Sequence, residues 1–298
     1  MSIIRKLLPK KVLNYYSGLK QQKLAQKMQS TQKISSRDFL KILSDELGIK
    51  KGDAVLIHSS IDRLNIDLSP KEIFEALRDA VGETGTILFP TYPAKSSYDF
   101  LISGEVWDIK KTPSYSGMLS EIARRSKESI RSLHPTKSVC AVGKDADFFV
   151  CEHHKSPYPY DKTSPYFKVI EKNGISIGLG VTSNYFSSTH VVDDYFKDDF
   201  PVAPYHKELF SARCIDYERN EIFVNTYAHN IRKMKFNIPL FFRKYIPKEI
   251  AKDFKIFGMD FFLVQSRPLF EKMCELAGDG ITIYRKIYYK PAKLLKLQ

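Results

Sequence analysis

The sequence predicts an α/β protein built around a mixed sheet. Between residues 53 and 179, short apolar segments typical of buried strands alternate with segments that carry helix-capping signals. After residue 190 the rhythm changes, and two alternating segments, 209–217 and 222–227, flank the turn residues 218–220. This pair predicts a C-terminal antiparallel hairpin, so we expect strands of both directions in the sheet.

The clearest helix signal follows the first predicted strand, residues 53–58. Ser69 is followed by Pro70 and Glu72, which supply an N-cap, a proline at the first helical position and the acid of a capping box, and the helix should run to about Val81. The other predicted elements are strands 85–90, 138–142 and 175–179 and helices 116–123, 164–172 and 268–276, the second and third of these helices being stopped by Gly174 and Gly278.

The net charge of +13 resides at the two ends of the chain. Residues 1–37 contain nine Lys or Arg and no acid, residues 281–298 contain five and no acid, and the stretch between them is nearly neutral. No nucleic-acid-binding motif accompanies the charge, so we expect no nucleic-acid partner. The pattern predicts a basic amphipathic arm (1–35), a central domain (36–280) and a basic tail (281–298).

Both ends interleave apolar and basic residues, as segments that lie on membrane surfaces do. Residues 3–13 and 283–290 show this pattern, and so does an internal basic, aromatic stretch, 231–256. Two interpretations stay open: solvated ends, or peripheral docking on the anionic inner face of a membrane.

Several protein classes are excluded by composition. No apolar run reaches the roughly 18 residues of a bilayer span and the N-terminus lacks the apolar core of a signal peptide, so we expect a cytoplasmic protein. The four cysteines are scattered, without a Cys-x-x-Cys pair or a histidine at ligand spacing. We therefore expect reduced thiols and no metal.

Three polar loops are candidates for ligand binding. Residues 58–60, 112–117 and 163–165 each follow a strand or open a helix, where free backbone N–H groups and a partial positive charge attract phosphate. Neither a Walker sequence nor G-x-G-x-x-G is present. Each loop could also be only a helix cap.

The segment 187–195 carries the most informative histidine. If Ser187 or Ser188 caps a helix, His190 lies in its first turn and Asp193 follows on the same face. The helix dipole disfavours the imidazolium there, which leaves a neutral imidazole able to take a proton. Attack of an amine on a thioester needs such a base. A histidine that only packs or caps is the alternative.

A second histidine, His134, stands directly before Pro135 at a strand entry, where polar neighbours suggest a lined pocket. The remaining histidines look like residues of surface loops: His153, His154, His206 and His229.

Taken in order, these segments resemble the aminoglycoside 3-N-acetyltransferase family from about residue 34 to residue 278. The matching pieces are Gly52-Asp53, residues 55–60, Gly85-Thr86, residues 89–91, Thr112-Pro113-Ser114, Gly117-Met118, residues 131–136 with Ser138, Ser164-Pro165, and His190 with Asp193.

The resemblance implies a three-layer α/β/α fold, acetyl-CoA as co-substrate, and direct transfer in a ternary complex with a histidine base and an acidic partner. It places the family's His-x-x-Glu on His190 and Asp193, and its His-Pro on His134 and Pro135. The predicted catalytic residues are His190, Asp193 and His134. Residues expected to bind coenzyme A are His58, Ser59, Ser60, Ser114, Gly117, Thr136 and Ser138, and those expected near the acceptor are Tyr92, Ser164 and Asp194.

This chain departs from the family at two points. Asp193 stands where the family usually has Glu, and Asp194 beside it could share the role. The basic ends and the 231–256 stretch would repel a polycationic drug. We therefore expect an acetyl-CoA-dependent N-acetyltransferase for a nucleotide-linked or lipid-linked amino sugar of surface polysaccharide synthesis, with aminoglycoside acetylation as the alternative.

Two other classes are weaker. Ser59 or Ser60 with a histidine and an aspartate would suit a serine hydrolase, but the G-x-S-x-G elbow is missing. A non-catalytic binding protein would show no coenzyme A binding. The acyl group, the acceptor and the assembly are left open, and a homodimer is one of the assemblies that we consider.

Overall fold

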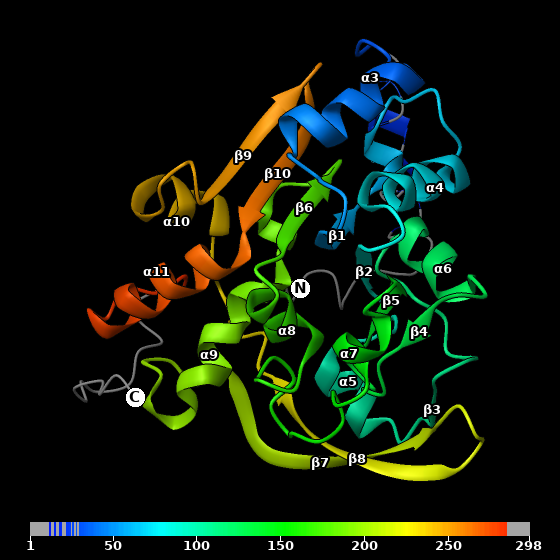
Figure 1. Ribbon diagram of the computed structural model, residues 1–298. Coiled ribbons are helices and arrows are strands. Elements are labelled where there is room, and N and C mark those ends of the chain that lie inside the picture. Colours follow the sequence, from blue (N-terminus) through cyan, green and yellow to red (C-terminus); the bar gives the residue numbers. More distant parts are fainter. Residues whose placement is uncertain are drawn as a thin grey trace.

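The computed structural model describes residues 30–284 without a break, together with scattered residues between 12 and 28. The predicted basic arm and tail therefore lie mainly outside the described residues. Within the described part, the central sheet has the order β4-β5-β2-β1-β6-β10-β9 and is covered by helices on both faces (Figure 1). This arrangement confirms the predicted three-layer α/β/α fold. No described helix has the length and apolar character needed to cross a membrane.

Three parallel strands form the middle of the sheet: β1 (Ala54–Ser59), β2 (Thr86–Pro90) and β6 (Ile175–Leu179). Antiparallel strands complete both sides of the sheet: β4 (Ile130–Arg131) and β5 (Val139–Gly143) beyond β2, and β10 (Met259–Gln265) and β9 (Ala251–Ile256) beyond β6. The sheet is mixed, as expected, but the antiparallel strands are not those of the predicted hairpin.

The alternation of side chains along the strands explains the layers. Val55 and Ile57 point into one core, with α3 (Ser36–Lys41), the π-helical turn Ile42–Glu46, α4 (Pro70–Val81) and α6 (Met118–Arg125). Leu56 points into the other, with α7 (Ala146–Val150) and α8 (Pro165–Glu171), and α11 (Ser266–Gly278) packs on α8. The capping box of α4 is present, because the Ser69 hydroxyl accepts from the Glu72 amide and the Glu72 carboxylate accepts from the Ser69 amide.

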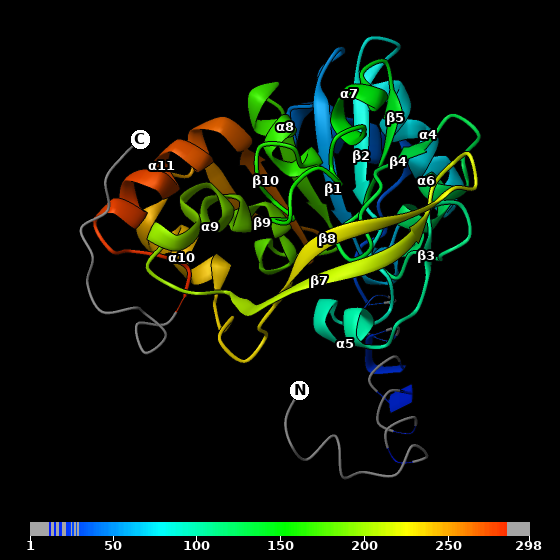
Figure 2. The same ribbon diagram turned by 90° about the horizontal axis from the view of Figure 1, so that it is seen from below.

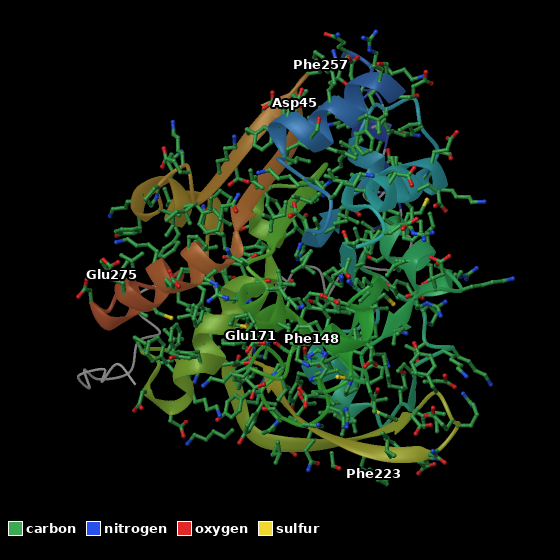
Figure 3. The ribbon with its side chains drawn as sticks, in the orientation of Figure 1. Asp45, Phe148, Glu171, Phe223, Phe257 and Glu275 are labelled. Atoms are coloured by element: carbon green, nitrogen blue, oxygen red, sulfur yellow. The ribbon has the colours of Figure 1, made fainter. Side chains whose placement is uncertain are left out.

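The predicted hairpin belongs to a separate sheet. β7 (Tyr205–Ile215) pairs with β8 (Glu221–His229) on one side and with the short β3 (Trp107–Asp108) on the other, and α5 (Ser97–Ile102) packs against β7 and β8. The hairpin runs along the lower side of the molecule in Figure 1 and crosses it in the view from below (Figure 2). Phe223 projects from its outer side (Figure 3) and is 65% exposed.

The chain between β6 and β7 consists of short turns rather than one helix. Three 3-10 turns, Ser183–Tyr185, Ser187–His190 and Lys197–Asp199, surround α9 (Val191–Phe196). After β8, the chain leads through a loop to α10 (Ile238–Tyr245). The last described residues, 281–284, pack against α9 and α10, which makes them part of the folded body.

Candidate active site

The parallel middle strands bring polar residues together at one edge of the sheet. β1 ends in His58 and Ser59, β2 is followed by Thr91 and Tyr92, and the chain after β6 leads to His190. The amide of Ser60 donates to the Leu179 carbonyl at 2.9 Å, which ties the ends of β1 and β6. Carboxyl ends of parallel strands are where α/β proteins bind ligands, so this edge is the candidate site.

A glycine allows the second polar loop to approach β1. Gly117 has φ 114° and forms the N-cap of α6, and a Cβ atom there would lie 2.8 Å from the Ser59 carbonyl oxygen. The loop is held by Ser116, whose hydroxyl accepts from the Tyr92 amide at 2.9 Å, and by Ser114, whose amide donates to Glu121 at 2.8 Å. The start of α6 therefore faces the end of β1.

A buried cation supports the same loop from behind. Arg131 is 2% exposed, and its guanidinium donates to the carbonyl oxygens of Thr91, at 2.6 Å, and Thr112, at 2.7 Å. Its Cζ atom lies 4.7 Å from the centre of the Trp107 ring. Burial lowers the pKa of Arg131 to about 10, so the side chain is charged at neutral pH.

His190 and Asp193 form the pair that the sequence predicts. The His190 Nδ1 atom lies 3.0 Å from the Asp193 carboxylate, and the two side chains are 8% and 1% exposed. The expected serine cap is wrong: His190 closes the turn Ser187–His190 and itself stands at the N-cap of α9, and no side chain caps either element. The spacing of three residues nevertheless brings the two groups together.

Tyr284 is the third member of this group. Its hydroxyl donates to the Asp193 carboxylate and lies 3.0 Å from His190 Nδ1. Burial raises the pKa of Asp193, and hydrogen bonds from His190 and Tyr284 oppose that rise. A proton on Nδ1 satisfies the carboxylate and leaves Nε2 as the acceptor nitrogen, and Nε2 makes no hydrogen bond to a described residue. The ring is thus prepared to accept a proton at Nε2.

Asp194 has different partners. Its carboxylate accepts from the Tyr205 hydroxyl at 2.6 Å and from the Tyr160 amide at 2.7 Å, and the residue is fully buried. Burial raises its pKa well above the ordinary value. Its bonds hold β7 and the 158–160 turn against α9, so Asp194 stabilises the fold. The carboxylate that contacts His190 is that of Asp193.

His134 is buried with both nitrogens engaged. Nδ1 accepts from the amides of Thr136 and Lys137, at 3.3 and 3.1 Å, so Nε2 carries the proton and lies 3.3 Å from the Thr226 hydroxyl. Its ring stacks on His153, with centroids 4.4 Å apart. Burial lowers the pKa of His134 well below the usual range. These contacts hold the turn before β5 in place. The catalytic role predicted for His134 stays a prediction.

His153 was expected on the surface, and that expectation is wrong. It is fully buried, its Nδ1 accepts from the Ser132 hydroxyl at 2.8 Å, and its Nε2 donates to the Pro159 carbonyl at 2.9 Å. Lys155, two residues later, is exposed, and such neighbours make a buried histidine look like a loop residue.

Several buried polar atoms of the segments that meet at this edge have no hydrogen-bond partner among the described residues. They include His58 Nδ1, Ser59 Oγ, Thr136 Oγ1, Ser188 Oγ and His229 Nε2; Trp107, Ser129 and His154 carry other such atoms. His58 Nε2 accepts from the Ser187 amide at 3.3 Å, so its unpartnered Nδ1 is a donor, and burial lowers its pKa to about 3. A bound molecule with carbonyl, amide or phosphate oxygens would satisfy such atoms.

The other predicted binding residues differ in what their hydroxyls do. Ser138 donates to the Thr91 carbonyl at 2.8 Å and lies 3.2 Å from Arg131 Nε, so its hydroxyl is occupied inside the protein. Ser164 caps α8 by accepting from the Phe167 amide at 3.2 Å. Ser60 donates to Asp62. Their predicted ligand contacts are untested by this geometry.

Tyr92 belongs to a group of three tyrosines next to His190. Its hydroxyl lies 2.6 Å from that of Tyr166 and 3.4 Å from that of Tyr160, and the Tyr160 ring is 5.5 Å from the His190 ring. Lys137 Nζ lies 4.7 Å from the centre of the Tyr92 ring and forms no ion pair with a described residue. Burial lowers the pKa of Lys137 to about 8.

Two hollows open beside α9. One of about 240 Å³ is lined by Asp193, Tyr158, Tyr205 and residues around them, and one of about 440 Å³ by Asp161, Asp194 and the 195–199 segment. A larger cavity of about 850 Å³ is lined by Lys51, Gly85 and Gly143 at the opposite ends of the strands, away from His190. The two hollows by α9 are lined by Asp193 and Asp194, which follow the candidate base by three and four residues.

Comparison with known proteins covers most of the residues described above. A family model described as "Aminoglycoside 3-N-acetyltransferase" matches residues 56–276. Aminoglycoside N(3)-acetyltransferase III of Acinetobacter baumannii is 25% identical over 162 residues, 50% of this chain and 56% of the relative, and enzyme VII of Streptomyces paromomycinus is 28% identical over 159 residues, 48% and 55% of the two chains. The chain belongs to the aminoglycoside 3-N-acetyltransferase family. It spans just over half the length of these curated relatives.

Solved structures of family members share the fold. A structure described as AAC-IIIb binary with CoASH has a TM-score of 0.69 at 17% identity and covers 84% of this chain and 98% of its own. AAC-VIa bound to sisomicin has a TM-score of 0.69 at 19% identity and covers 84% and 99%. The matched residues 56–276 include His190 and Asp193 and end before Tyr284.

Sequence reasoning missed two side chains of this family member's site. His229 was expected on the surface, but it is 6% exposed, stacks on Tyr205 at 4.5 Å and lies 5.1 Å from the His190 ring. Extending the predicted strand from Tyr227 by two residues would have placed it beside the site. Tyr284 was assigned to the basic tail, and no local pattern connects it with residues ninety positions earlier.

Proposed function

We propose that the chain is an acetyl-CoA-dependent N-acetyltransferase that acetylates an amino group of an aminoglycoside-like amino sugar. The observation that carries the proposal is the His190 ring, whose Nδ1 is held by Asp193 while Nε2 is unbonded within the described residues. A ring fixed in this tautomer is a general base. Family membership and the names of the relatives support the acyl donor and the acceptor class.

In the proposed step, His190 Nε2 takes a proton from the acceptor amine as its nitrogen bonds to the thioester carbonyl carbon. The carbon–sulfur bond then breaks, and the proton on Nε2 goes to the departing thiolate, which gives an amide and free coenzyme A. Asp193 keeps the ring oriented and stabilises its transient positive charge. His58 Nδ1, Ser59 Oγ and the start of α6 would hold the donor, because they are unpartnered or carry a partial positive charge.

The acceptor class that we now favour is not the one the composition suggested. The basic ends argued for an anionic amino sugar of polysaccharide synthesis, but the named relatives support aminoglycosides instead. The local charge does not decide between the two classes, because the hollows beside α9 are lined by Asp161, Asp198 and Asp199 and also by Lys162, Lys197 and Lys207. The preference for an aminoglycoside-like acceptor therefore rests on the relatives.

The proposal is tested by mass spectrometry after incubating the protein with acetyl-CoA and a panel of aminoglycosides and amino-deoxy nucleotide sugars. Addition of one acetyl group to an aminoglycoside amine, with release of one equivalent of coenzyme A, is the expected result. Thermal unfolding with millimolar coenzyme A should show a raised melting temperature. No melting shift and no acetylated product would overturn the proposal.

One observation favours the second candidate, an anionic amino sugar. Lys137 is partly buried beside Tyr92 and has no carboxylate partner among the described residues, and such an ammonium attracts an anion and repels a polycation. The variant Lys137→Gln separates the candidates by sign: KM should fall for a polycationic acceptor and rise for an anionic one. A weaker affinity for coenzyme A alone would instead assign Lys137 to the donor.

We also propose a membrane-docking surface, formed by the cations and apolar side chains of residues 231–248. Figure 2 shows the segment between β8 and α10 looping out from the body. Ile231 is 59% and Leu240 47% exposed. The six cations of the surface are all exposed, and none forms an ion pair with a described residue: Arg232, Lys233, Lys235, Arg243, Lys244 and Lys248. Each adds about 1 kcal/mol at most near an anionic bilayer.

Vesicle sedimentation tests this surface. The protein should bind vesicles that contain phosphatidylglycerol and stay unbound with phosphatidylcholine alone, and replacing Arg232, Lys233 and Lys235 by Gln should weaken binding at least tenfold. The control replaces Lys41, Lys71 and Lys127, three exposed lysines elsewhere, by Gln. Equal binding to both vesicle types, equal losses in the two variants, or tighter binding to single-stranded DNA would each contradict the proposal. The predicted docking of residues 1–33 lies mainly outside the described residues.

A further inference from the structure

The His190–Asp193 pair is completed by a side chain from the end of the folded chain. Tyr284 is 5% exposed, and its hydroxyl contacts both partners, donating to the Asp193 carboxylate and lying 3.0 Å from His190 Nδ1. Two donors, the His190 N–H and the Tyr284 O–H, thus converge on one carboxylate oxygen. A carboxylate held by two donors has one orientation.

The position of Tyr284 is itself held by neighbouring segments. Residue 284 forms a β-bridge with Phe236 in the loop after β8, and the Phe236 ring lies 5.6 Å from the His190 ring. The Tyr284 ring also packs edge-on against Phe200, with centroids 6.1 Å apart. These contacts come from two separate segments and hold the Tyr284 hydroxyl beside the pair.

The short side chain of Asp193 explains why a contact from Tyr284 would matter. An aspartate side chain is one methylene shorter than a glutamate and sits closer to its own helix, so it depends more on an external partner to stay directed at the imidazole. The family model ends at residue 276, eight residues before Tyr284. Tyr284 thus lies outside the matched region.

We propose that Tyr284 is a positioning residue that holds the Asp193 carboxylate against His190 Nδ1, and so keeps Nε2 as the proton-accepting nitrogen. This inference rests on the proposed function, since it assigns His190 as the base. Tyr284 acts through Asp193 and transfers no proton itself: its hydroxyl is a donor to the carboxylate, and burial together with Asp193 raises its pKa well above the usual range.

A double-mutant cycle tests whether the tyrosine acts through the acid. Tyr284→Phe should lower kcat about tenfold with little change in the KM for acetyl-CoA, because one hydrogen bond to a charged group is lost. In an Asp193→Asn background the same change should have no further effect. Ser176→Ala is the control, since it removes a buried hydroxyl that lies 3.3 Å from the Ser266 hydroxyl, in β6 and away from the candidate site. It should leave kcat within about twofold of wild type.

The cycle separates positioning from general loosening. Additive losses of kcat in the double variant, or a loss of kcat in Ser176→Ala as large as in Tyr284→Phe, would overturn the proposal.

A measurement without substrate keeps this inference distinct from the proposed function. Nitrogen-15 NMR of the imidazole reports which ring nitrogen carries the proton. Wild-type protein should show His190 protonated at Nδ1, and Tyr284→Phe should show a mixture of tautomers. If no acceptor is acetylated but the tautomer changes in this way, the positioning role of Tyr284 is supported and the acceptor assignment fails. An unchanged tautomer in Tyr284→Phe refutes the positioning role, even if the enzyme is active.

Discussion

Two groups of buried histidines lie within the same domain and differ in what their nitrogens do. In the stack of His134 and His153 all four nitrogens have partners, which include two backbone amides, a backbone carbonyl and a serine hydroxyl. At His190 only Nδ1 has partners among the described residues, Asp193 and Tyr284. Burial is similar in both groups, so burial alone does not mark a candidate base. An acid on Nδ1 together with an open Nε2 distinguishes His190, because His58 and His229 also carry a nitrogen without a partner in the described part of the chain.

The comparison also explains why one His-containing motif looked as promising as the other in the sequence. Both precede helix or strand starts, and both have polar neighbours. Their difference is a matter of hydrogen-bond partners that come from residues far apart in the chain. Experiments that remove one ring at a time should therefore affect rate in one group and stability in the other.

The largest effect is expected for His190→Ala. Removing a general base costs on the order of 100- to 10,000-fold in rate, so turnover should fall at least 100-fold while the affinity for coenzyme A stays nearly unchanged. Steady-state kinetics and calorimetric titration measure the two quantities. His134→Ala, by contrast, leaves two amides without their acceptor and should lower the melting temperature. If His190→Ala retained more than about a tenth of wild-type turnover while His134→Ala lost nearly all of it, His134 would be the base and His190 would have the structural role.

A smaller effect should distinguish the neighbouring aspartates. Asp193→Asn removes a charged hydrogen-bond partner of His190 and should lower kcat about 10- to 100-fold. Asp194→Asn perturbs bonds to Tyr205 and Tyr160 and should act mainly on stability. Rates and melting temperatures of both variants give the answer, and a loss of kcat in Asp194→Asn as large as in Asp193→Asn, at equal folded fraction, would show that both acids serve the base.

The smallest effect concerns pH. Burial lowers the pKa of His153 to about 3. Below about pH 6.5 the unfolded chain therefore binds a proton at this residue that the native state does not bind. Stability is thus lost as pH falls from 6.5 toward 3, by about 1.4 kcal/mol per pH unit for this residue. His153→Gln should be less stable at pH 7.5 yet lose less stability between pH 6.5 and 5. Urea unfolding at these pH values tests it; parallel pH dependences would mean that His153 does not titrate as proposed.

Much of the fold was predictable where local signals were strong. The strands β1, β2 and β6 are continuous apolar runs, and α4 carries a complete capping box, so both were found within one or two residues. The hairpin β9–β10 was missed because Lys252, Asp253 and Lys255 interrupt its alternation and the stretch was taken as a basic surface. Its charged residues lie on an edge strand, where they face solvent.

The candidate site was predictable only in its local part. His190 and Asp193 are three residues apart, and their contact follows from helical spacing. Tyr284 and His229 reach the same place through tertiary packing, which no short-range pattern encodes. The bond of the Ser138 hydroxyl to the Thr91 carbonyl, 47 residues away, is also tertiary, whereas Ser164 bonds locally as the cap of α8.

The guanidinium of Arg131 has a consequence for long-range attraction. Its donors end on neutral oxygens, and the nearby Glu121 pairs with Arg124 and Arg125, so the charge of Arg131 has no counterion of its own among the described residues. A cation shielded from water is weakly screened by salt. The 112–117 loop therefore lies in a positive electrostatic potential that salt screens weakly and that adds to the dipole of α6. This potential would attract a phosphorylated donor toward the end of β1 from several ångströms away.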